Sequence, residues 1–241
     1  DIKKELFDND KIKTLFQVKD FEKDTEDDII VNFADGTQFR ITAKGSEQKM
    51  RGLKWNNKRP DLIIGDDLEN DEIVLNPERR TKFKRWFYGA LVPSLAANGV
   101  IRIVGTILHE DSLLNNLMPS LWDRDTVVEP LKIWSKKTRN SWRSIKYRAH
   151  TEDFKHILWP QRYSAEWFLD EMRDFTARGL SDVYSQEYLN EPIDESVAFF
   201  KKHDFLPELA DDKKKVLNYY ITADLAISKD STADYSVFIV G

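Results

Sequence analysis

Two adjacent carboxylates end a short apolar run in the first third of the chain. Residues 62–64 are Leu-Ile-Ile, and Gly65, Asp66 and Asp67 follow them. Pro60 precedes the run and suits the first residue of a strand, because proline cannot donate a ladder hydrogen bond. A short branched run of this kind is typical of a strand that is buried on both faces.

The two carboxylates predict a nucleotide site of the Walker B form. Unpaired buried charge is costly, and Mg²⁺ held by a carboxylate and by substrate phosphates would compensate for it. In this interpretation Asp66 holds Mg²⁺, directly or through water, and Asp67 orients the attacking water. Both residues fall at the carboxyl end of the strand, where open α/β sheets bind their ligands. The alternative is an acidic strand-to-helix turn in which Asp67 or Asn70 is a cap, and the pattern alone does not decide between the two.

A helix is predicted shortly after this site. Asn76, Pro77 and Glu78 supply an N-cap, a proline at the first helical position and an acid in the first turn. The pair Asn98-Gly99 predicts the end of the helix. Apolar residues recur at helical spacing and predict one buried face; they are Phe83, Trp86, Phe87, Ala90 and Leu91.

A second strand is predicted at residues 100–104, and Gly105 and Thr106 follow it. The order strand, amphipathic helix, strand indicates a parallel α/β sheet. Thr106 then lies at the carboxyl end of its strand, and we expect it near Asp66 and Asp67.

Two basic stretches flank the carboxylates in the sequence. Residues 44–59 contain six Lys or Arg residues, and residues 79–85 contain five more. The first stretch is predicted to be a surface loop or a short helix. The second lies mostly on the polar side of the predicted helix, where a basic cluster is more often a solvated face than a DNA contact.

The remaining elements are predicted from hydrophobic period, caps and turn residues. They are a short helix near 12–18, a hairpin of strands 29–33 and 39–41, a short helix at 112–117, short strands and loops over 120–160, helices at 164–178 and 181–189, a linker around Pro192, and an antiparallel pair of strands at 216–223 and 233–240 with Asp224 at the end of the first.

Composition limits the class of protein. With 241 residues the chain permits one large domain or two. A hydrophobic fraction of 41% predicts a substantial core, and a charged fraction of 33% predicts a soluble protein. No apolar run approaches the roughly 20 residues that a membrane helix needs, and no signal peptide opens the chain. Without cysteine there is no disulfide or thiolate metal site, so we expect an intracellular protein. The net charge of −5 gives no global signal for nucleic acid.

A series of short stretches runs through residues 40–241 in one order. They are Arg51-Gly52, the run 59–67, Val104-Gly105-Thr106 leading into His109-Glu110-Asp111, Trp159-Pro160-Gln161-Arg162-Tyr163, Gln186 with Asn190-Glu191-Pro192, and Thr222-Ala223-Asp224-Leu225-Ala226 with Asp234-Tyr235-Ser236-Val237. No single stretch is diagnostic. The ordered set resembles the large terminase subunit of tailed bacteriophages, the motor that packages DNA into the procapsid.

The resemblance implies a fold, a domain order and a function. It implies an ASCE-type (P-loop NTPase-like) ATPase domain with a parallel sheet over residues 1–190. Residues 191–215 would be a connector, and 216–241 would be the first strands of an RNase H-like nuclease domain. The implied function is ATP-driven translocation of double-stranded DNA into the procapsid, together with endonucleolytic cutting of concatemeric DNA.

The resemblance also implies roles for the residues that match the ATPase motifs of the family. Asp66 matches the Walker B aspartate that binds Mg²⁺, and Asp67 stands at the catalytic carboxylate position. That position usually holds a glutamate, or a second aspartate in some branches, so Glu69 is a rival for the base. Gly105 and Thr106 match the coupling motif that senses the γ-phosphate of ATP.

Two further roles are implied at other places in the chain. Arg51 matches an arginine that, in related motors, reaches into the ATP site of a neighbouring subunit. Arg59 is the alternative for that role, since it lies closer in sequence to Asp66. Asp224 matches the first metal-binding carboxylate of the nuclease, which would use Mg²⁺ or Mn²⁺.

The resemblance also implies partners and a location. We expect double-stranded DNA, a portal protein and a small terminase subunit as partners, and a homo-oligomeric ring on the procapsid. The location would be the cytoplasm of an infected bacterial host, without a membrane.

The sequence departs from the family pattern at both ends. No G-x-x-x-x-G-K-[ST] phosphate loop occurs in the chain, so we expect it upstream of Asp1. The later acidic residues of the nuclease are expected beyond Gly241, which directly follows a strand-like run. The chain is therefore predicted to be a fragment that holds half of each active site and is inactive alone.

Two alternatives differ in class from a motor with a nuclease. One is another nucleic-acid-translocating ASCE ATPase, such as a helicase, in which Asp224 is only a turn residue. The other is a DNA-binding or scaffold domain without enzymatic activity, which would leave Asp66 and Asp67 unexplained.

Overall fold

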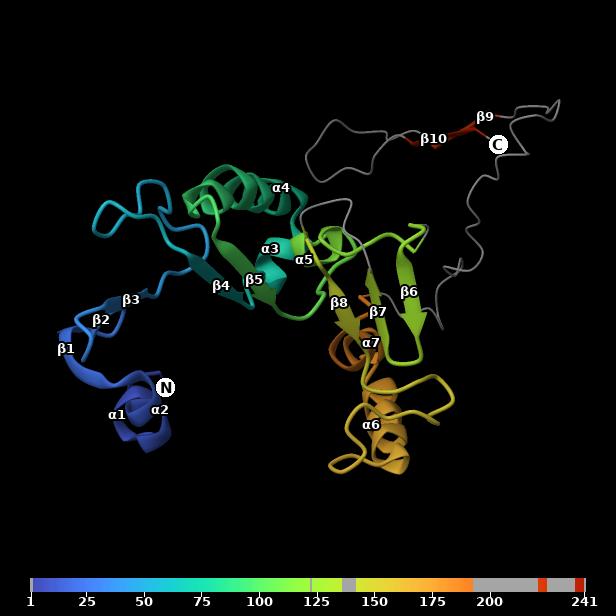
Figure 1. Ribbon diagram of the computed structural model, residues 1–241. Helices are drawn as coiled ribbons and strands as arrows, with labels where there is room; N and C mark the ends of the chain where they lie inside the picture. Colours follow the sequence, from blue (N-terminus) through green and yellow to red (C-terminus); the bar gives the residue numbers. More distant parts are fainter. Residues whose placement is uncertain (1, 122, 136–141, 193–220, 225–236, 241) are drawn as a thin grey trace. The chain divides into compact units, whose positions relative to one another are not determined.

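The computed structural model of the protein describes residues 2–121, 123–135, 142–192, 221–224 and 237–240 (Figure 1). The chain divides into two compact units, Asp1–Asp194 and Glu195–Gly241. The first unit mixes helices with parallel and antiparallel strands, and the described part of the second is one strand pair. The assignment of residues 1–190, 191–215 and 216–241 to an ATPase domain, a connector and a nuclease domain stays a prediction.

The first unit begins with two short helices and an antiparallel sheet in the order β1-β2-β3. The predicted hairpin is confirmed as β2 and β3, but the helix predicted near 12–18 is wrong in extent. Gln17 takes a left-handed conformation (φ 51) after α2, and Val18 starts a strand that was not predicted. That strand is rich in charge and lacks an apolar alternation, which removes the usual signal. The elements are α1 (Ile2–Asp8), α2 (Asp10–Phe16), β1 (Val18–Asp24), β2 (Asp28–Phe33) and β3 (Gln38–Thr42).

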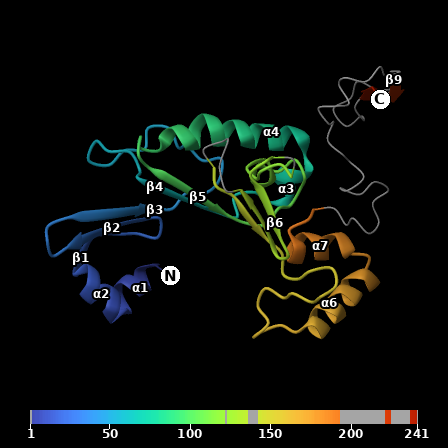
Figure 2. The same cartoon turned by 45° about the vertical axis from the view of Figure 1, so that its right-hand side comes forward.

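The predicted parallel strands are confirmed as β4 (Leu62–Asp66) and β5 (Val100–Val104), which pair in register with Asp66 opposite Val104. Between them in sequence lie α3 (Asp71–Leu75) and α4 (Pro77–Trp86), capped by Asn70 and Asn76 respectively. Figures 1 and 2 show α4 beside the two strands. The predicted apolar face of this helix is buried, and Phe83, Phe87 and Leu91 form a core on which Ile63, Ile101 and Ile103 pack.

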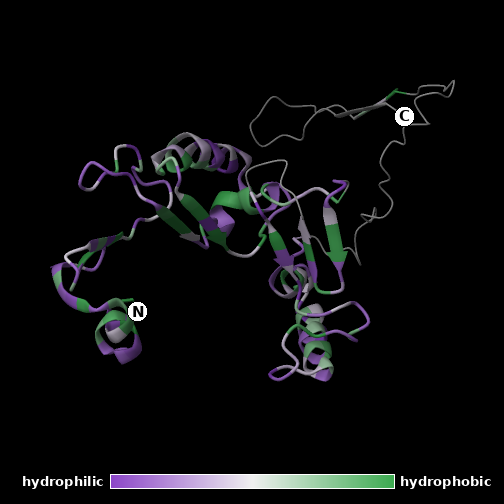
Figure 3. Ribbon diagram, in the orientation of Figure 1, coloured by the Kyte–Doolittle hydropathy of each residue, from purple (hydrophilic) through white to green (hydrophobic). Residues whose placement is uncertain are grey.

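The prediction that residues 62–64 are buried on both faces is wrong for the described part of the chain. Leu62 and Ile64 are 51% and 66% exposed, and on the neighbouring strand Val100 and Val104 are 50% and 64% exposed. The cause is that α4 covers one face of the pair, while no described element covers the other. Figure 3 shows how apolar both strands are. The described residues thus form a parallel pair within a mixed α/β unit, and a larger parallel sheet is not part of them.

The helix that starts at Pro77 ends earlier than the predicted Asn98-Gly99. After Trp86 the chain forms a π-helical turn, Phe87–Leu91, and then a 3₁₀ turn, Val92–Ser94. Pro93 explains the change, because proline has no backbone N–H and clashes with the carbonyl group four residues earlier. That carbonyl belongs to Gly89, and it accepts hydrogen bonds from a side chain instead.

The rest of the first unit follows the predicted order of elements. The short strands form an antiparallel sheet in the order β6-β7-β8, and Ser164 caps the long helix by accepting the N–H of Trp167. The elements are α5 (Leu113–Asn116), β6 (Thr126–Glu129), β7 (Lys132–Ser135), β8 (Ile145–Tyr147), α6 (Ala165–Ala177) and α7 (Ser181–Leu189).

The described part of the second unit consists of β9 (Ile221–Asp224) and β10 (Val237–Val240), which are antiparallel with Asp224 opposite Val237. The predicted pairing is confirmed for these residues. The connector after Pro192, the start of the strand at 216 and the turn at 225–232 lie outside the described residues. Among the helices that the structure describes, none is long and apolar enough to cross a membrane.

Candidate functional site

The carboxyl ends of β4 and β5 bring Asp67 and Gly105 together. Asp67 donates its backbone N–H to the carbonyl oxygen of Val104 at 3.1 Å, which continues the ladder one residue past the strand. Its backbone is left-handed, with φ 42. A Cβ atom on residue 105 would lie 3.1 Å from Oδ1 of Asp67, so a larger residue there would press on the carboxylate. Glycine therefore lets the Asp67 side chain lie across the end of the neighbouring strand.

A cavity of ≈ 320 Å³ opens at this edge of the sheet. Asp67, Gly105 and Thr106 line it, so the predicted neighbourhood of Asp67 and Thr106 is confirmed, while their chemical roles stay predictions. The segment after β4, the turn before α5 and the side of α7 with Gln186 and Glu187 complete the walls. Ligand sites in α/β proteins commonly have this position and size.

The lining of the cavity is acidic. Asp67, Glu69, Asp71 and Glu187 contribute to it, and no Lys or Arg is among its described lining residues. A polyphosphate would be repelled by these carboxylates unless a cation accompanied it. Among the described residues, no three His, Asp or Glu side chains group closely enough to hold a metal ion by themselves. The lining thus fits a cation that phosphate oxygens would also hold, which is how Mg²⁺ commonly binds with nucleotides.

Glu69 has a structural role in this cavity. Its two carboxylate oxygens accept the backbone N–H groups of Leu113 and Leu114 at 2.8 and 3.0 Å. Those groups open α5 and have no partner within the helix. By contrast, the Asp67 side chain has no hydrogen bond or ion pair to any described residue. Of the two candidates for the base, the geometry therefore favours Asp67.

Asp66 does not line the cavity. It ends β4 on the strand face that carries Leu62 and Ile64, because successive side chains alternate between faces. Its side chain is exposed and has no hydrogen bond or ion pair to a described residue. The structure therefore brings Asp67, Gly105 and Thr106 together and leaves Asp66 outside the lining, on the face of the strand pair that no described element covers.

Arg51 and Arg59 lie away from the cavity lining within one chain. Arg51 donates from Nε and Nη2 to the carbonyl oxygen of Gly89 at 3.2 and 3.0 Å. Arg59 donates to the carbonyl oxygen of Pro93. Both arginines thus satisfy carbonyl groups in the irregular segment after α4. An additional role in a neighbouring subunit stays a prediction for either of them.

The basic region consists of residues 44–59 and 77–86, which pack on each other. Trp86 donates its indole N–H to the carbonyl oxygen of Gln48 at 2.9 Å, and Met50 joins the core of Phe83 and Phe87. The region holds eleven Lys or Arg residues and two acids, in a chain whose net charge is −5. Five exposed cations in it have neither an acidic partner nor a side-chain hydrogen bond among the described residues; they are Lys44, Lys49, Lys54, Lys58 and Arg85.

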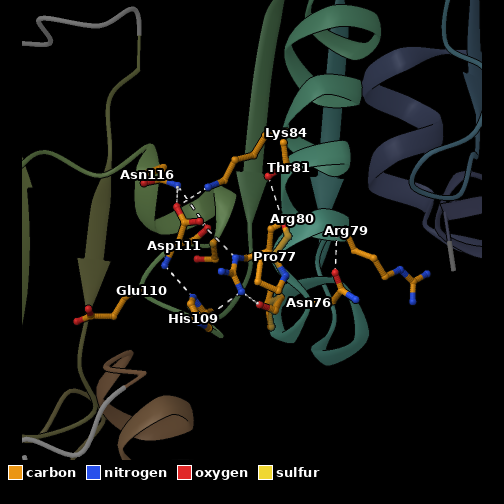
Figure 4. A network of polar contacts seen from close by, with 12 residues as sticks. Asn76, Pro77, Arg79, Arg80, Thr81, Lys84, His109, Glu110, Asp111 and Asn116 are labelled. Atoms are coloured by element: carbon orange, nitrogen blue, oxygen red, sulfur yellow. Dashed lines mark hydrogen bonds and ion pairs between the residues drawn. The ribbon is translucent and has the colours of Figure 1, made fainter. Parts of the chain in front are cut away.

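A polar network ties α4 to the turn that follows the Thr106 segment (Figure 4). Asp111 accepts hydrogen bonds from Lys84 at 2.5 Å, from Arg80 at 3.3 Å and from Asn116 at 3.2 Å. The Lys84 ammonium, foremost among these donors, lowers the pKa of Asp111 to about 2. Nδ1 of His109 accepts the backbone N–H of Asp111 at 2.9 Å. Burial and the nearby Arg80 charge lower the pKa of His109, so the network favours a neutral imidazole.

Asp224 is the last residue of β9, as predicted from the sequence. Its pairing with Val237 fixes the backbone position, while the acidic residues that a two-metal site would need are not among the described residues of this unit. The metal-binding role of Asp224 stays a prediction.

Comparison with known proteins identifies no relative. No family model, curated protein or solved structure matches the chain. The class of the protein therefore rests on the residues and their geometry.

The structural roles of two side chains of this site were not predicted from the sequence. Glu69 was expected only as a rival base, whereas it caps α5. Asn190 was noted only as part of a short stretch, whereas its amide contacts the residue after Thr106. Local sequence offered one signal for Asn190, since asparagine after a helix commonly takes the left-handed conformation.

Proposed function

We propose that the chain belongs to an ATP-driven DNA-packaging motor of the large-terminase type. In this proposal the first unit contributes to an ASCE-type ATPase site and the second begins an RNase H-like nuclease. The complete protein would translocate double-stranded DNA into a procapsid and cut concatemers, in the cytoplasm of an infected bacterial host. It would act as a homo-oligomeric ring with a portal protein and a small terminase subunit.

One observation carries the ATPase part of the proposal. The Asp67 carboxylate has no partner among the described residues and lies across Gly105, beside Thr106, in an acidic cavity at the ends of two parallel strands. In a structural turn such a side chain would act as a cap, as the Asn70 amide does for α3 and the Glu69 carboxylate does for α5. Because Asp67 is exposed, its free carboxylate carries no desolvation cost by itself, and its place in a ligand-sized cavity is what supports a chemical role.

Hydrolysis of ATP depends on positioning and charge stabilisation more than on covalent chemistry. Asp67 would accept a hydrogen bond from the attacking water and orient it. Thr106 would contact the γ-phosphate from the end of β5. Asp66, which does not line the cavity, would hold the cation through water. Mg²⁺, when bound, would supply neutralisation of the phosphate charge.

The basic region supports nucleic acid as the partner. Its unpaired cations suit the phosphate backbone of DNA, which binds proteins largely through Lys and Arg contacts. The segregation of these cations from an otherwise acidic chain makes a local positive field.

The test of the proposal is DNA-stimulated ATP hydrolysis by the complete protein. We expect Asp67→Asn to abolish hydrolysis while nucleotide binding persists, because asparagine keeps the shape of the side chain but removes its charge. Glu69→Gln should weaken the cap of α5 and lower stability, yet the folded variant should still hydrolyse ATP. If Asp67→Asn hydrolyses ATP normally and Glu69→Gln does not, the assignment of the base is wrong. Absence of hydrolysis in the unaltered complete protein would refute the proposed ATPase.

A further inference from the structure

Asn190 connects three segments of the first unit. Its Oδ1 accepts the backbone N–H of Ile107 at 3.2 Å, and its Nδ2 donates to the carbonyl oxygen of Tyr147 at 2.9 Å. Its own carbonyl oxygen accepts a hydrogen bond from Lys146 at 3.3 Å. The end of α7 is thereby joined to β8 and to the segment that follows β5.

The conformation of Asn190 shows why its side chain matters. The residue ends α7 in the left-handed region, with φ 56 and ψ 34. Glycine is the usual residue at such a helix end, since it has no steric penalty there. Asparagine tolerates the same conformation and adds an amide, and both ends of that amide are bonded to backbone groups here. The backbone conformation alone does not require the amide, so the amide has its own task.

The bond from Asn190 acts directly beside the cavity. Ile107 follows Thr106 and is 3% exposed, so its N–H has little access to water. The N–H of Ile107 and the carbonyl group of Thr106 share one planar peptide unit. Holding the N–H therefore fixes the orientation of the peptide through which Thr106 enters the cavity wall. Gln186, one helical turn before Asn190, lines the same cavity, so one end of α7 both forms the wall and orients the Thr106 segment.

We infer that Asn190 is a positioning residue, which holds the Thr106–Ile107 peptide against the cavity. The importance of this position for catalysis rests on the proposed ATPase function, whereas the hydrogen bond between Ile107 and Asn190 does not. Asn190 contacts no reacting group and acts through Thr106. A small shift of a group that meets the γ-phosphate is costly, since misplacement by about 1 Å can lower a rate by about 10²-fold.

Two variants separate the amide from the backbone conformation. Asn190→Gly keeps the left-handed conformation and removes both side-chain bonds. Asn190→Asp keeps an oxygen that can accept the N–H of Ile107 but cannot donate to Tyr147. Gln17→Gly is the matched control, because Gln17 also ends a helix in the left-handed region (φ 51) and has no side-chain bond to a described group. It lies outside the residues of the cavity wall.

The experiment measures amide hydrogen exchange at Ile107 and the steady-state kinetics of ATP hydrolysis in the complete protein. We expect Asn190→Gly to exchange about tenfold faster at Ile107, as the loss of one hydrogen bond implies. Its kcat should fall at least about tenfold while KM for ATP changes little, because the affected contact matters in the transition state. Gln17→Gly should resemble the unaltered protein in both measurements. Asn190→Asp keeps the acceptor for Ile107 but sets a carboxylate oxygen against the Tyr147 carbonyl group, so its exchange at Ile107 and its kcat should lie closer to the unaltered protein than those of Asn190→Gly.

The outcomes distinguish this inference from the proposed function. Unchanged exchange at Ile107 in Asn190→Gly would show that Asn190 does not protect this N–H group, whatever reaction the protein catalyses. Equal loss of kcat in Asn190→Gly and Asn190→Asp, with faster exchange at Ile107 only in Asn190→Gly, would overturn the positioning of Thr106 and attribute the effect to the bond with Tyr147. If the unaltered protein hydrolyses no ATP, the proposed function fails, and the exchange measurement still decides whether Asn190 holds Ile107.

Discussion

Two carboxylates that lie two residues apart in the sequence have opposite surroundings. Glu69 accepts two backbone N–H groups at the start of α5, so its charge is used within the fold. Asp67 has no such partner among the described residues, and its left-handed backbone turns it over Gly105. Residue type alone could not separate them, because either acid can serve as a base. The difference arises from groups that are 44 and 45 residues away in sequence.

His150 is predicted to make stability depend on pH. The ring is 2% exposed, stacks on Phe154 and contacts the Tyr184 hydroxyl at 2.7 Å through Nε2. Burial, with a further contribution from Arg148, lowers the pKa of His150 below its ordinary value of about 6.5. The unfolded chain therefore binds this proton more readily than the folded protein. The stability is fully present above about pH 6.5 and is lost as the pH falls toward the lowered pKa.

The measurement is urea unfolding of the first unit in the complete protein at pH values between about 7.5 and 5.5. His150→Phe keeps an aromatic ring against Phe154 and removes the titrating group, so its stability should change less across this range. His109 also has a lowered pKa. The variant His109→Gln therefore measures how much His109 contributes to the pH dependence of the free energy of unfolding. If the free energy of unfolding of His150→Phe changes with pH as steeply as that of the unaltered protein, the buried ring does not cause the pH dependence.

Among the elements, those with strong local signals could be predicted from the sequence. Asn76-Pro77 and Ser164 are caps that act on their own helices, and α4 and α6 begin where these residues predict. Strand β1 could not be predicted, since its stability comes from pairing with β2 rather than from an apolar pattern. The exposure of Leu62 and Ile64 could not be predicted either, because burial depends on what packs on the sheet.

The candidate site was likewise predictable only where a local signal exists in the sequence. The meeting of Asp67 and Thr106 follows from two parallel strands with a common edge, and that prediction holds. The contact of Asn190 with Ile107 joins residues 83 positions apart. No periodicity or cap signal specifies such a bond, since it depends on how α7 packs against the end of β5.

The basic region is predicted to bind DNA through its unpaired cations. Replacing Lys54, Lys58 and Arg85 by glutamine should weaken binding and make it less sensitive to salt. Each phosphate contact contributes about 0.9 to the slope of log K against log salt, so three lost contacts would reduce the slope by about 2.7. The matched control replaces the exposed Lys11, Lys13 and Lys19 by glutamine, which changes the net charge equally at another place in the first unit.

Fluorescence anisotropy of a labelled duplex at several salt concentrations gives both the affinity and the slope. Equal effects of the two triple variants would mean that only net charge matters. In that case the basic region would be a solvated face, the alternative that its sequence also allowed.

Arg51 is predicted to act across a subunit boundary. Arg51→Ala subunits should be inactive alone, because an arginine supplied in trans can contribute about 10³ to 10⁵ in rate. Mixed with Asp67→Asn subunits, they should regain ATP hydrolysis, since each variant supplies the group that the other lacks. The assay is ATP turnover of the mixture against each variant alone.

The contact of Arg51 with Gly89 requires a control for folding. Arg51→Lys keeps a donor for the Gly89 carbonyl group and should stay as stable as the unaltered protein, yet lysine lacks the planar fork of arginine. Full hydrolysis by Arg51→Ala alone would limit Arg51 to its bond with Gly89, and Arg59 would then be the candidate to test.

The separation into two compact units predicts that the two proposed activities can be removed independently. Asp67 belongs to the unit Asp1–Asp194, and Asp224 belongs to Glu195–Gly241. Asp224 ends β9, and backbone pairing with β10 fixes its position, as a carboxylate of a two-metal site requires. Asparagine keeps the size of the side chain and removes the charge that would bind a cation. We therefore expect Asp224→Asn in the complete protein to lose DNA cleavage that depends on Mg²⁺ or Mn²⁺.

ATP hydrolysis should persist in Asp224→Asn, and thermal stability should stay equal or rise slightly, because a carboxylate cluster without metal repels itself. Asp234→Asn is the charge-matched comparison and should affect cleavage less, although residue 234 lies outside the described residues. Cleavage is measured on a supercoiled plasmid, and ATP turnover on the same preparation. Retained cleavage by folded Asp224→Asn would reduce Asp224 to a turn residue. The metal ligands of the nuclease would then be residues other than Asp224. Absence of metal-dependent cleavage in the unaltered complete protein would instead favour a translocating helicase without a nuclease, in which the carboxylate at the end of β9 has no metal to bind.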